Sequence, residues 1–361
     1  MPWNPRVKSA LDELLRTAGR ESAGYDGANP PAAVFDFDDT CIFGDIGEQA
    51  LRRQIDDLVF GLDPDHFDRL LPRAPCGATH MPANHGGARI ADIAADLADH
   101  YARLHADFSA MGTAKPPAFI RERAEYIDFV VKMNLLFDGL IDTPGVGKAW
   151  VYPWTARFFA GLDRAAVRAM GLEAWDEASV APIGVRALAS PAHFASRAGA
   201  QAFSIRTGIR ALPEIAWLMN ALRDAGFDVF VVTASLEDVV APTAARVYDI
   251  DETHVFGMRT IMDGDRYTDV ADERDGYAIT FGPGKTRIIE NFVGRAPLLV
   301  AGDSDTDHHM LTAYPETRVR LVIDRGQGGA MAELRARGAR GEDGIVVQRR
   351  DERAGTFTPE S

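Results

Sequence analysis

The sequence predicts an α/β protein: a Rossmann-like parallel sheet with a large, mainly helical domain inserted after the first strand. Two observations lead to this class. Short, wholly apolar runs alternate with helical segments, which is typical of strands buried on both faces of a parallel sheet. The first such run, at 32–37, is separated from the next by a long region in which apolar residues recur three and four apart. We therefore expect one sheet whose chain is interrupted by a helical domain.

The N-terminal segment is expected to be an amphipathic helix. Its apolar residues recur at helical spacing: Val7, Leu11, Leu14 and Leu15. The stretch "ESAGYDGANPP" that follows is rich in Gly, Pro and Asn, which favours a linker. Residues 1–30 are therefore assigned to an N-terminal helix and linker, and residues 31–45 begin the α/β core.

The inserted, mainly helical domain is expected to span residues 46–205. Three stretches in and around it have helical spacing, namely 45–62, 88–108 and 116–140. The stretch 72–87 contains Gly, Pro and His and is expected to be a loop.

From residue 206 the pattern of alternating helices and strands resumes. A helix is expected over 213–226, because Pro213 suits its first turn and Gly226 its end. The following strands are expected at 227–235, 254–259, 296–303, 319–324 and 345–348, with helices at 237–248 and 285–293 and a hairpin around 262–268. The core is thus assigned to 31–45 plus 206–350, and residues 351–361 are expected to form a frayed tail.

Composition excludes several classes of protein. The chain has 361 residues, of which 46% are hydrophobic, and a formal net charge of −14, which repels nucleic acids. No stretch approaches the roughly 20 apolar residues of a membrane span. Two cysteines, Cys41 and Cys76, form no disulfide framework or zinc motif. We expect a cytoplasmic protein, or a periplasmic one if a leader was removed, with neither nucleic-acid nor membrane partners; its oligomeric state is undetermined.

Carboxylates cluster where the first strand ends. Asp36, Asp38, Asp39 and Asp45 fall within ten positions, directly after an apolar run. Like charges this close are costly unless a cation compensates them, and clusters of oxygen ligands suit Mg²⁺. Two other strands end in "VVTAS" and "GDSDTD", and "GPGKT" brings Lys285 to the start of a helix. The carboxyl ends of parallel strands share one edge, so these groups are expected to meet there.

Two other motifs fail on spacing. A calcium loop beginning at Asp36 needs Gly at its sixth position and Glu at its twelfth, where the chain has Cys41 and Gly47. A nucleotide-binding P-loop ending in "GKT" needs Gly where the chain has Ile279.

Taken in order, "DFDDT", "VVTAS", the lysine of "GPGKT" and "GDSDTD" resemble the four motifs of the haloacid dehalogenase superfamily. Within it, the chain looks most like phosphorylcholine phosphatases and more distantly like phosphoserine phosphatases. The stretch "VYPWTARFFAGL" at 151–162 contributes to the first likeness. The helical insertion also matches the cap position of this class.

The resemblance implies a set of catalytic roles. Asp36 would be the nucleophile that forms an aspartyl-phosphate, and Asp38 the general acid and base. Thr233 and the backbone amide of Ala234 would bind phosphoryl oxygens, and Lys285 would balance their charge.

The resemblance also implies a Mg²⁺ site. Asp36, Asp303 and the main-chain carbonyl of Asp38 would bind the ion, with Asp307 supporting this shell through water. Asp305 and Asp39 are expected to be spacers, and Ser235 is equally compatible with a site role and a turn role.

The substrate is predicted only in part. Asp45 lies nine residues after Asp36, where phosphoserine phosphatases place an acid that meets the substrate's amine, and Glu48 follows. The aromatic residues Trp150, Tyr152 and Trp154 could hold a quaternary ammonium group, although composition alone favours a plain helical core stripe.

The predicted function is Mg²⁺-dependent hydrolysis of a small phosphomonoester, with phosphocholine as one candidate. A phosphoserine-type phosphatase, a phosphotransferase using the same site, and a non-catalytic phospho-ligand binder are the alternatives.

Overall fold

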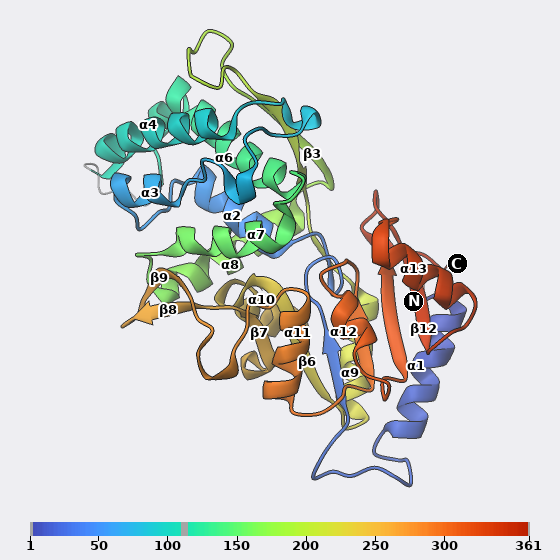
Figure 1. The fold of residues 1–361 in the computed structure, drawn as a ribbon. Helices are drawn as coiled ribbons and strands as arrows, with labels where there is room; N and C mark the ends of the chain where they lie inside the picture. Colours follow the sequence, from blue (N-terminus) through green and yellow to red (C-terminus); the bar gives the residue numbers. More distant parts are fainter. Residues whose placement is uncertain (1–2, 110–114, 360–361) are drawn as a thin grey trace.

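The computed structural model describes residues 3–109 and 115–359 (Figure 1). Its centre is a seven-stranded sheet of order β13-β12-β11-β10-β1-β6-β7. The strands from β12 to β7 run parallel, and β13 pairs antiparallel with β12. Their bounds are β1 (Ala32–Phe35), β6 (Asp228–Leu236), β7 (Val255–Met258), β10 (Leu299–Gly302), β11 (Val319–Asp324), β12 (Ile345–Asp351) and β13 (Thr356–Phe357). The predicted fold class, a Rossmann-like parallel α/β core with many helices, is therefore confirmed.

Strand β1 occupies the position at which the sheet's connections reverse direction. Val34 lies opposite Val300 of β10 on one side and Phe230 of β6 on the other. The chain reaches β6 on one side of β1 and later crosses to β10 on the other side. In open α/β sheets, such a switch point leaves a crevice at the carboxyl ends of the strands, and ligands bind there. The residues after β1, β6 and β10 surround this crevice.

Helices cover both faces of the sheet, as the wholly apolar strands require. Phe35 and Val231 belong to one buried layer, and Val34 and Val232 to the other. The first layer is covered by α1 (Pro5–Ala18), α9 (Pro213–Asp224) and α10 (Glu237–Tyr248). The second is covered by α11 (Pro283–Ile288) with the π-helical turn Ile289–Val293, α12 (His308–Thr312) and α13 (Gly329–Ala339).

Most of the remaining helices follow β1 and build a second hydrophobic core (Figure 1). They are α2 (Ile46–Asp56), α3 (Pro64–Leu70), α4 (Ile90–Ser109), α5 (Ala118–Arg121), α6 (Ala124–Ile141) and α7 (Gly147–Ala156). Helix α8 (Arg164–Val180) comes after them and packs in the first core instead. Phe67, Phe129 and Phe158 are fully buried in this second core. Within the described ranges, no helix is both long enough and apolar enough to cross a membrane.

Helix α8 connects the inserted helices to the sheet. Val167 and Met170 belong to the core that also contains Phe35. Gly171 faces α10, and a Cβ at this position would come within 2.7 Å of the Val239 carbonyl oxygen. Only glycine therefore allows α8 to pack this closely on α10.

The region 46–205 is less uniformly helical than predicted. It contains β3 (Gly184–Ala189), which pairs antiparallel with β4 (Ala202–Thr207) across the predicted boundary at 205. Both strands are largely exposed, so they lack the apolar runs that reveal a buried strand. The hairpin predicted around 262–268 is confirmed as β8 (Thr260–Asp263) and β9 (Arg266–Ala271), and β2 (Ile42–Phe43) pairs with β5 (Arg210–Ala211).

The prediction of a frayed tail from residue 351 is wrong for residues 351–359. Strand β13 folds back on β12, and Phe357 is buried against Trp3 with 5.3 Å between ring centroids. A single buried aromatic residue has no periodicity, so the sequence pattern did not reveal this contact.

A buried ionic cluster ties the β3–β4 hairpin to helices α4 and α6. The Lys132 ammonium donates to Asp96 Oδ2 at 2.8 Å, Asp128 Oδ2 at 2.6 Å and Ser196 Oγ at 2.7 Å. The amide of Arg197 donates to the other Asp96 oxygen at 2.8 Å. One lysine therefore offsets the charge of two buried carboxylates. The same lysine also hydrogen-bonds Ser196 in the connection between β3 and β4.

We predict that Lys132→Met lowers the free energy of unfolding by about 3–5 kcal/mol, because it removes the one fully buried ammonium that Asp96 and Asp128 share. Among the described residues, their other ionic partners are the more exposed Arg197, 3.8 Å from Asp96, and the imidazole of His100, 2.8 Å from Asp128. Urea unfolding checks this. The matched control is Lys8→Met, since Lys8 pairs with Asp12 on the surface of α1 and should cost less than about 1 kcal/mol. Equal losses in the two variants would mean that the cluster does not stabilise the helical region.

Candidate active site

The chain turns sharply where β1 ends. The Asp36 amide still donates to Ala301 of β10 at 2.9 Å, which continues the strand by one residue. Asp39 then adopts a left-handed conformation with φ of 58°, and its side chain accepts the Gly44 amide at 2.9 Å. This turn places the carboxylates of Asp36 and Asp38 at the carboxyl edge of the sheet.

Lys285 joins the segments after β1 and β10. It lies in the first turn of α11, is fully buried, and donates to Asp36 Oδ1 at 2.5 Å and Asp307 Oδ1 at 2.7 Å. Burial lowers its pKa, but the carboxylates of Asp307 and Asp36 outweigh burial, so the pKa is raised and the ammonium stays charged. The ion pairs also supply the reason for a lysine near a helix N-terminus, where a cation is otherwise unfavourable.

Three buried carboxylates could hold a metal ion. One oxygen from each of Asp36, Asp303 and Asp307 lies within 4.8 Å of the others. Burial and the charge of Asp307 raise the pKa of Asp36 well above its usual value, and burial raises the pKa of Asp303 to about 6. A cation would relieve this repulsion, and an all-oxygen set of buried carboxylates fits Mg²⁺.

Asp307 differs from the other two acids because, among the described residues, it accepts backbone amides as well as the Lys285 ammonium. Oδ1 accepts from Lys285, and Oδ2 accepts the amides of Asp303 at 3.0 Å and Ser304 at 3.1 Å. Burial would raise its pKa, but these donors, Lys285 foremost, lower it. Its geometry therefore suits a residue that shapes the loop and anchors Lys285.

Asp38 lies among donors from two elements. Its Oδ1 accepts the Ile46 amide at 2.7 Å, and its Oδ2 accepts Ser235 Oγ at 2.7 Å and Thr233 Oγ1 at 3.3 Å. Burial raises the pKa of Asp38 to about 6, although the hydrogen bonds from Ser235 and Ile46 oppose the change. A carboxyl group with this pKa can both donate and accept a proton near neutral pH.

A cavity opens above these groups, which we call the Asp36 cavity. Its lining comprises Asp36, Asp38, Asp39, Asp45, Glu48, Lys148, Tyr152, Arg206, Thr233, Ala234, Ser235, Asp303, Ser304, Thr306 and Arg325. Thr233 and Ala234, at the end of β6, are therefore beside the acids after β1 and β10. Segments far apart in the chain thus contribute to one cavity at the sheet edge.

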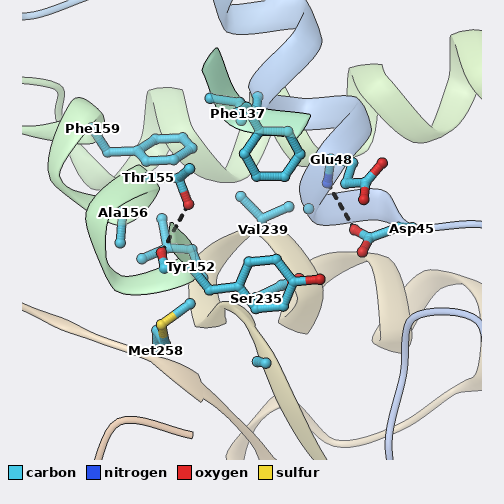
Figure 2. Close-up of a pocket in the computed structure, with 14 residues that line it drawn as sticks. Asp45, Glu48, Phe137, Tyr152, Thr155, Ala156, Phe159, Ser235, Val239 and Met258 are labelled. Atoms are coloured by element: carbon cyan, nitrogen blue, oxygen red, sulfur yellow. Dashed lines mark hydrogen bonds between the residues drawn. The ribbon is translucent and has the colours of Figure 1, made fainter. Parts of the chain in front are cut away.

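A second, more apolar cavity adjoins the first, and we call it the Tyr152 pocket (Figure 2). Asp45, Glu48, Tyr152, Ala234 and Ser235 line both cavities. The remaining walls come mainly from the inserted helices and from α10, and include Leu51, Phe137, Thr155, Phe159, Val239 and Met258. A molecule whose charged end occupies the Asp36 cavity would place its other end here.

Asp45 is the most perturbed acid of the Tyr152 pocket. Its Oδ1 accepts the Glu48 amide at 2.7 Å and so caps the N-terminus of α2. Burial raises the pKa of Asp45 well above its usual value, with further contributions from the charges of Asp38 and Glu48. Glu48 itself pairs with Arg52 at 3.1 Å. The pocket thus has a carboxylate that a bound cation would stabilise.

Of the three aromatic residues proposed for the substrate, only Tyr152 reaches these cavities. Trp154 is buried among the inserted helices, where its indole nitrogen donates to the Leu70 carbonyl at 2.7 Å. Trp150 stacks on Trp154 at 5.6 Å between ring centroids. Both line a different cavity, together with Arg259 and Thr260. The expectation for Trp150 and Trp154 is corrected accordingly: the core-stripe interpretation fits Trp154, and neither residue lines the Asp36 cavity or the Tyr152 pocket.

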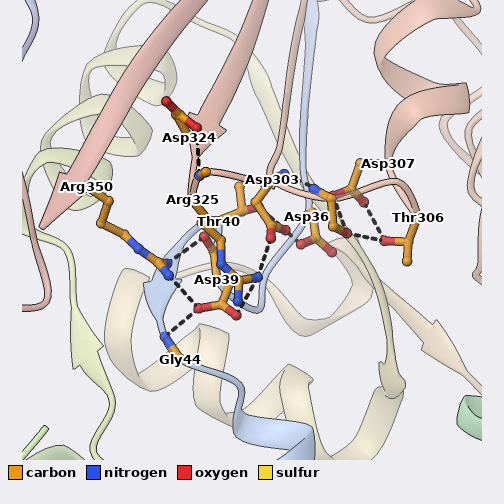
Figure 3. A network of polar contacts seen from close by, with 12 residues as sticks. Asp36, Asp39, Thr40, Gly44, Asp303, Thr306, Asp307, Asp324, Arg325 and Arg350 are labelled. Carbon is orange, nitrogen blue, oxygen red and sulfur yellow. Dashed lines mark hydrogen bonds and ion pairs between the residues drawn. The ribbon is translucent and has the colours of Figure 1, made fainter. Parts of the chain in front are cut away.

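Sequence reasoning missed an arginine network beside the acids (Figure 3). Arg325 Nη1 lies 2.7 Å from Asp39 Oδ2 and 2.6 Å from Asp303 Oδ2, while Arg350 Nη2 lies 3.0 Å from Asp39 Oδ1. Burial raises the pKa of Asp39, but the guanidinium groups of Arg325 and Arg350 overcome it and lower that pKa to about 2. Asp39 is thus an ionic anchor of the turn. One feature of the sequence could have predicted the role of Arg325. Arg325 directly follows the strand β11, so it lies at the same edge of the sheet as the acids.

Comparison with known proteins finds one close structural match, and the function of that protein is unknown. No family model matches the chain, and no curated protein matches it significantly. A crystal structure of a conserved protein of unknown function from Anaerococcus prevotii DSM 20548 matches with a TM-score of 0.89 and 25% identity, covering 100% of this chain and 96% of that one. The two chains therefore share the whole fold.

Two weaker structural matches were also found. A protein of unknown function from Bordetella pertussis Tohama I has a TM-score of 0.43 and 15% identity, covering 89% of this chain and 98% of that one. A phosphoserine phosphohydrolase-like protein from Francisella tularensis subsp. tularensis SCHU S4 has a TM-score of 0.30 and 15% identity, covering 86% and 83%. Similarities this low support no functional inference, so function is argued from the site's own residues.

We predict that the acids of the site make the metal-free protein less stable as pH rises. Asp38 and Asp303 have folded pKa values of about 6, above their ordinary value of 3.8. Their contribution to stability is therefore complete below about pH 3.8 and is lost as pH rises through about 6. In EDTA, the melting temperature should fall between about pH 4 and 6.5 and level off above this range, and Asp303→Asn should make the fall shallower. Parallel curves for the wild type and this variant would contradict the raised pKa of Asp303.

Proposed function

We propose that this protein is a Mg²⁺-dependent phosphomonoester hydrolase that works through an aspartyl-phosphate on Asp36. The observation that carries the proposal is the convergence of Asp36, Asp38, Thr233 and Asp303 on one cavity, with Lys285 bonded to Asp36 beneath it. These are the residues for which the four sequence motifs imply catalytic roles. Their shared cavity gives that implication a physical basis.

The donor set is suited to Mg²⁺. Asp36, Asp303 and the carbonyl oxygen of Asp38 would hold the ion, and Asp307 would support them through its bonds to the Asp303 and Ser304 amides. When bound, Mg²⁺ supplies positive charge next to the transferring phosphoryl group. This charge is needed because acids dominate the Asp36 cavity.

In the first step, a carboxylate oxygen of Asp36 attacks phosphorus. The Asp36–phosphorus bond forms while the bond from phosphorus to the ester oxygen breaks, and Asp38 donates a proton to the departing oxygen. Thr233 Oγ1 and the Ala234 amide would donate hydrogen bonds to the phosphoryl oxygens. Lys285 orients Asp36 through its 2.5 Å contact and offsets negative charge.

In the second step, water replaces the nucleophile. Asp38, now deprotonated, accepts a proton from the water as its oxygen attacks phosphorus, and the Asp36–phosphorus bond breaks to release inorganic phosphate. The pKa of about 6 allows Asp38 to act as acid and then as base. The Ile46 amide and the Ser235 hydroxyl hold its carboxylate in place during both steps.

The leaving group is proposed to carry a positive charge. Asp45 lines the Tyr152 pocket, and no ion pair of Asp45 is found in the described part of the chain. Tyr152 and Phe137 provide aromatic faces in the same pocket, and such faces attract ammonium groups. A choline-like group therefore fits the chemistry of the pocket.

A phosphoserine-type ester is the second candidate substrate, and one specific observation supports it. Lys148 lines the Asp36 cavity, is half-buried, and has no ion pair among residues 3–109 and 115–359. Its ammonium could meet a carboxylate on the substrate, which phosphocholine lacks.

We predict that Asp36→Asn lowers kcat/KM at least about 1,000-fold, because it removes the nucleophile. EDTA should abolish turnover by the wild type, and Mg²⁺ should restore it. Acid quenching with a radiolabelled ester should trap a phosphoprotein with the wild type and none with Asp36→Asn. Asp305→Asn is the matched control, since Asp305 is exposed in the loop after β10 and its loss should leave activity within about twofold. Full activity of Asp36→Asn, or turnover in EDTA, would exclude the mechanism.

We predict a preference for a positively charged leaving group. Phosphocholine should be hydrolysed with a kcat/KM about tenfold or more above 3,3-dimethylbutyl phosphate, which has the same shape without the charge. Asp45→Asn keeps an oxygen for capping α2 and should remove most of this difference. Equal values for the two esters would exclude a choline-type substrate, and a higher value for phosphoserine than for either would favour the second candidate.

A further inference from the structure

The guanidinium of Arg325 lies between a carboxylate of the turn after β1 and a carboxylate proposed to bind metal. One of its nitrogens contacts Asp39 Oδ2 at 2.7 Å and Asp303 Oδ2 at 2.6 Å (Figure 3). The side chain is 16% exposed, and it enters the site from the residue directly after β11. A permanent positive charge therefore stands next to the acid triad.

The other ion pairs around Arg325 show which of the two acids depends more on it for charge compensation. Asp39 has a second buried partner, Arg350, whose side chain is fully buried and which also donates to the Asp39 carbonyl oxygen at 3.0 Å. Asp303 has Arg325 as its ion-pair partner in the described part of the chain. Around the proposed metal position, Asp36, Asp303 and Asp307 are thus opposed by two cations, Lys285 and Arg325.

Asp303 has contacts other than Arg325 that hold it in position. The Asp303 amide donates to Asp307 Oδ2 at 3.0 Å, and Asp303 Oδ1 accepts Thr40 Oγ1 at 3.2 Å. The same Oγ1 lies 3.1 Å from Asp36 Oδ2, so the hydroxyl sits between the two acids and can donate its single proton to either one. Because these contacts remain without Arg325, the main effect of the guanidinium on an incoming cation is electrostatic repulsion.

We propose that Arg325 is a built-in counter-ion that stabilises the metal-free site and weakens the binding of Mg²⁺ there. The proposal rests on the metal site of the proposed function. Arg325 partly neutralises Asp303 when no metal is present, which lowers the cost of burying three carboxylates together. When Mg²⁺ binds, two like-charged cations share one buried site, and the ion is held less tightly than the acids alone would hold it. Arg325 thus sets the concentration range over which the site fills.

The test compares a neutral and a charged substitution. Arg325→Gln removes the charge and keeps a hydrogen-bond donor, whereas Arg325→Lys keeps the charge. Titration calorimetry on EDTA-treated protein measures the Kd for Mg²⁺, and thermal unfolding in EDTA measures the stability of the metal-free form. We expect Arg325→Gln to bind Mg²⁺ at least about fivefold more tightly than the wild type and to melt at a lower temperature in EDTA. Because it keeps the positive charge, Arg325→Lys should bind Mg²⁺ within about twofold of the wild type.

The matched control is Arg295→Gln. Arg295 forms an ion pair with Asp228 at the beginning of β6, the opposite end of the sheet from the acids, so its loss should leave the Kd for Mg²⁺ unchanged. An unchanged or weakened Mg²⁺ affinity in Arg325→Gln would overturn the proposal; weakening would mean that Arg325 positions Asp303. If Arg325→Gln does not fold without Mg²⁺, Arg325→Lys decides: a wild-type Kd supports the proposal, and a Kd changed more than about threefold overturns it.

The same measurements separate this inference from the proposed function. A wild-type protein that binds no Mg²⁺ would remove both. A wild-type protein that binds Mg²⁺ but hydrolyses no phosphate ester would remove the proposed function, while the order of the Kd values would still decide the role of Arg325.

Discussion

The site depends on the pairing of a buried lysine with two aspartates. Lys285 bridges Asp36 and Asp307, and this contact joins the segment after β1, the first turn of α11 and the loop after β10. Without a cation, burying these acids together would cost several kcal/mol. Lys285, with Arg325 and Arg350 nearby, makes it physically possible to place so much negative charge at the end of a buried strand.

The turn after β1 links this charged centre to the inserted helices over a short stretch of chain. Asp38 accepts the amide of Ile46, the first residue of α2, and Asp45 caps the same helix. The residue proposed to move the proton and the residue proposed to recognise the leaving group are therefore fixed to one helix N-terminus. A shift of α2 would change both together, so the position of the inserted helices bears on chemistry as well as on specificity.

The sequence predicted the core strands well because each is a short, wholly apolar run, and it predicted the acids because each follows such a run. It failed where burial leaves no local pattern. Phe357 is a single aromatic residue whose partner, Trp3, lies at the other end of the chain. The exposed strands β3 and β4 have no apolar side to reveal them. Trp150 and Trp154 were close in sequence to Tyr152, but α7 gives their side chains different surroundings.

The sequence by itself determined the α/β class, the order of the elements and the identity of the acids, the threonine and the lysine expected to meet at the sheet edge. These follow from local patterns, because a strand buried on both faces must be apolar and parallel strands end together. Only the tertiary structure decided which charges compensate these acids and which side chains form the Tyr152 pocket. Arg325, Phe137 and Met258 come from different elements, so their proximity depends on how those elements pack and has no signature in the order of the residues.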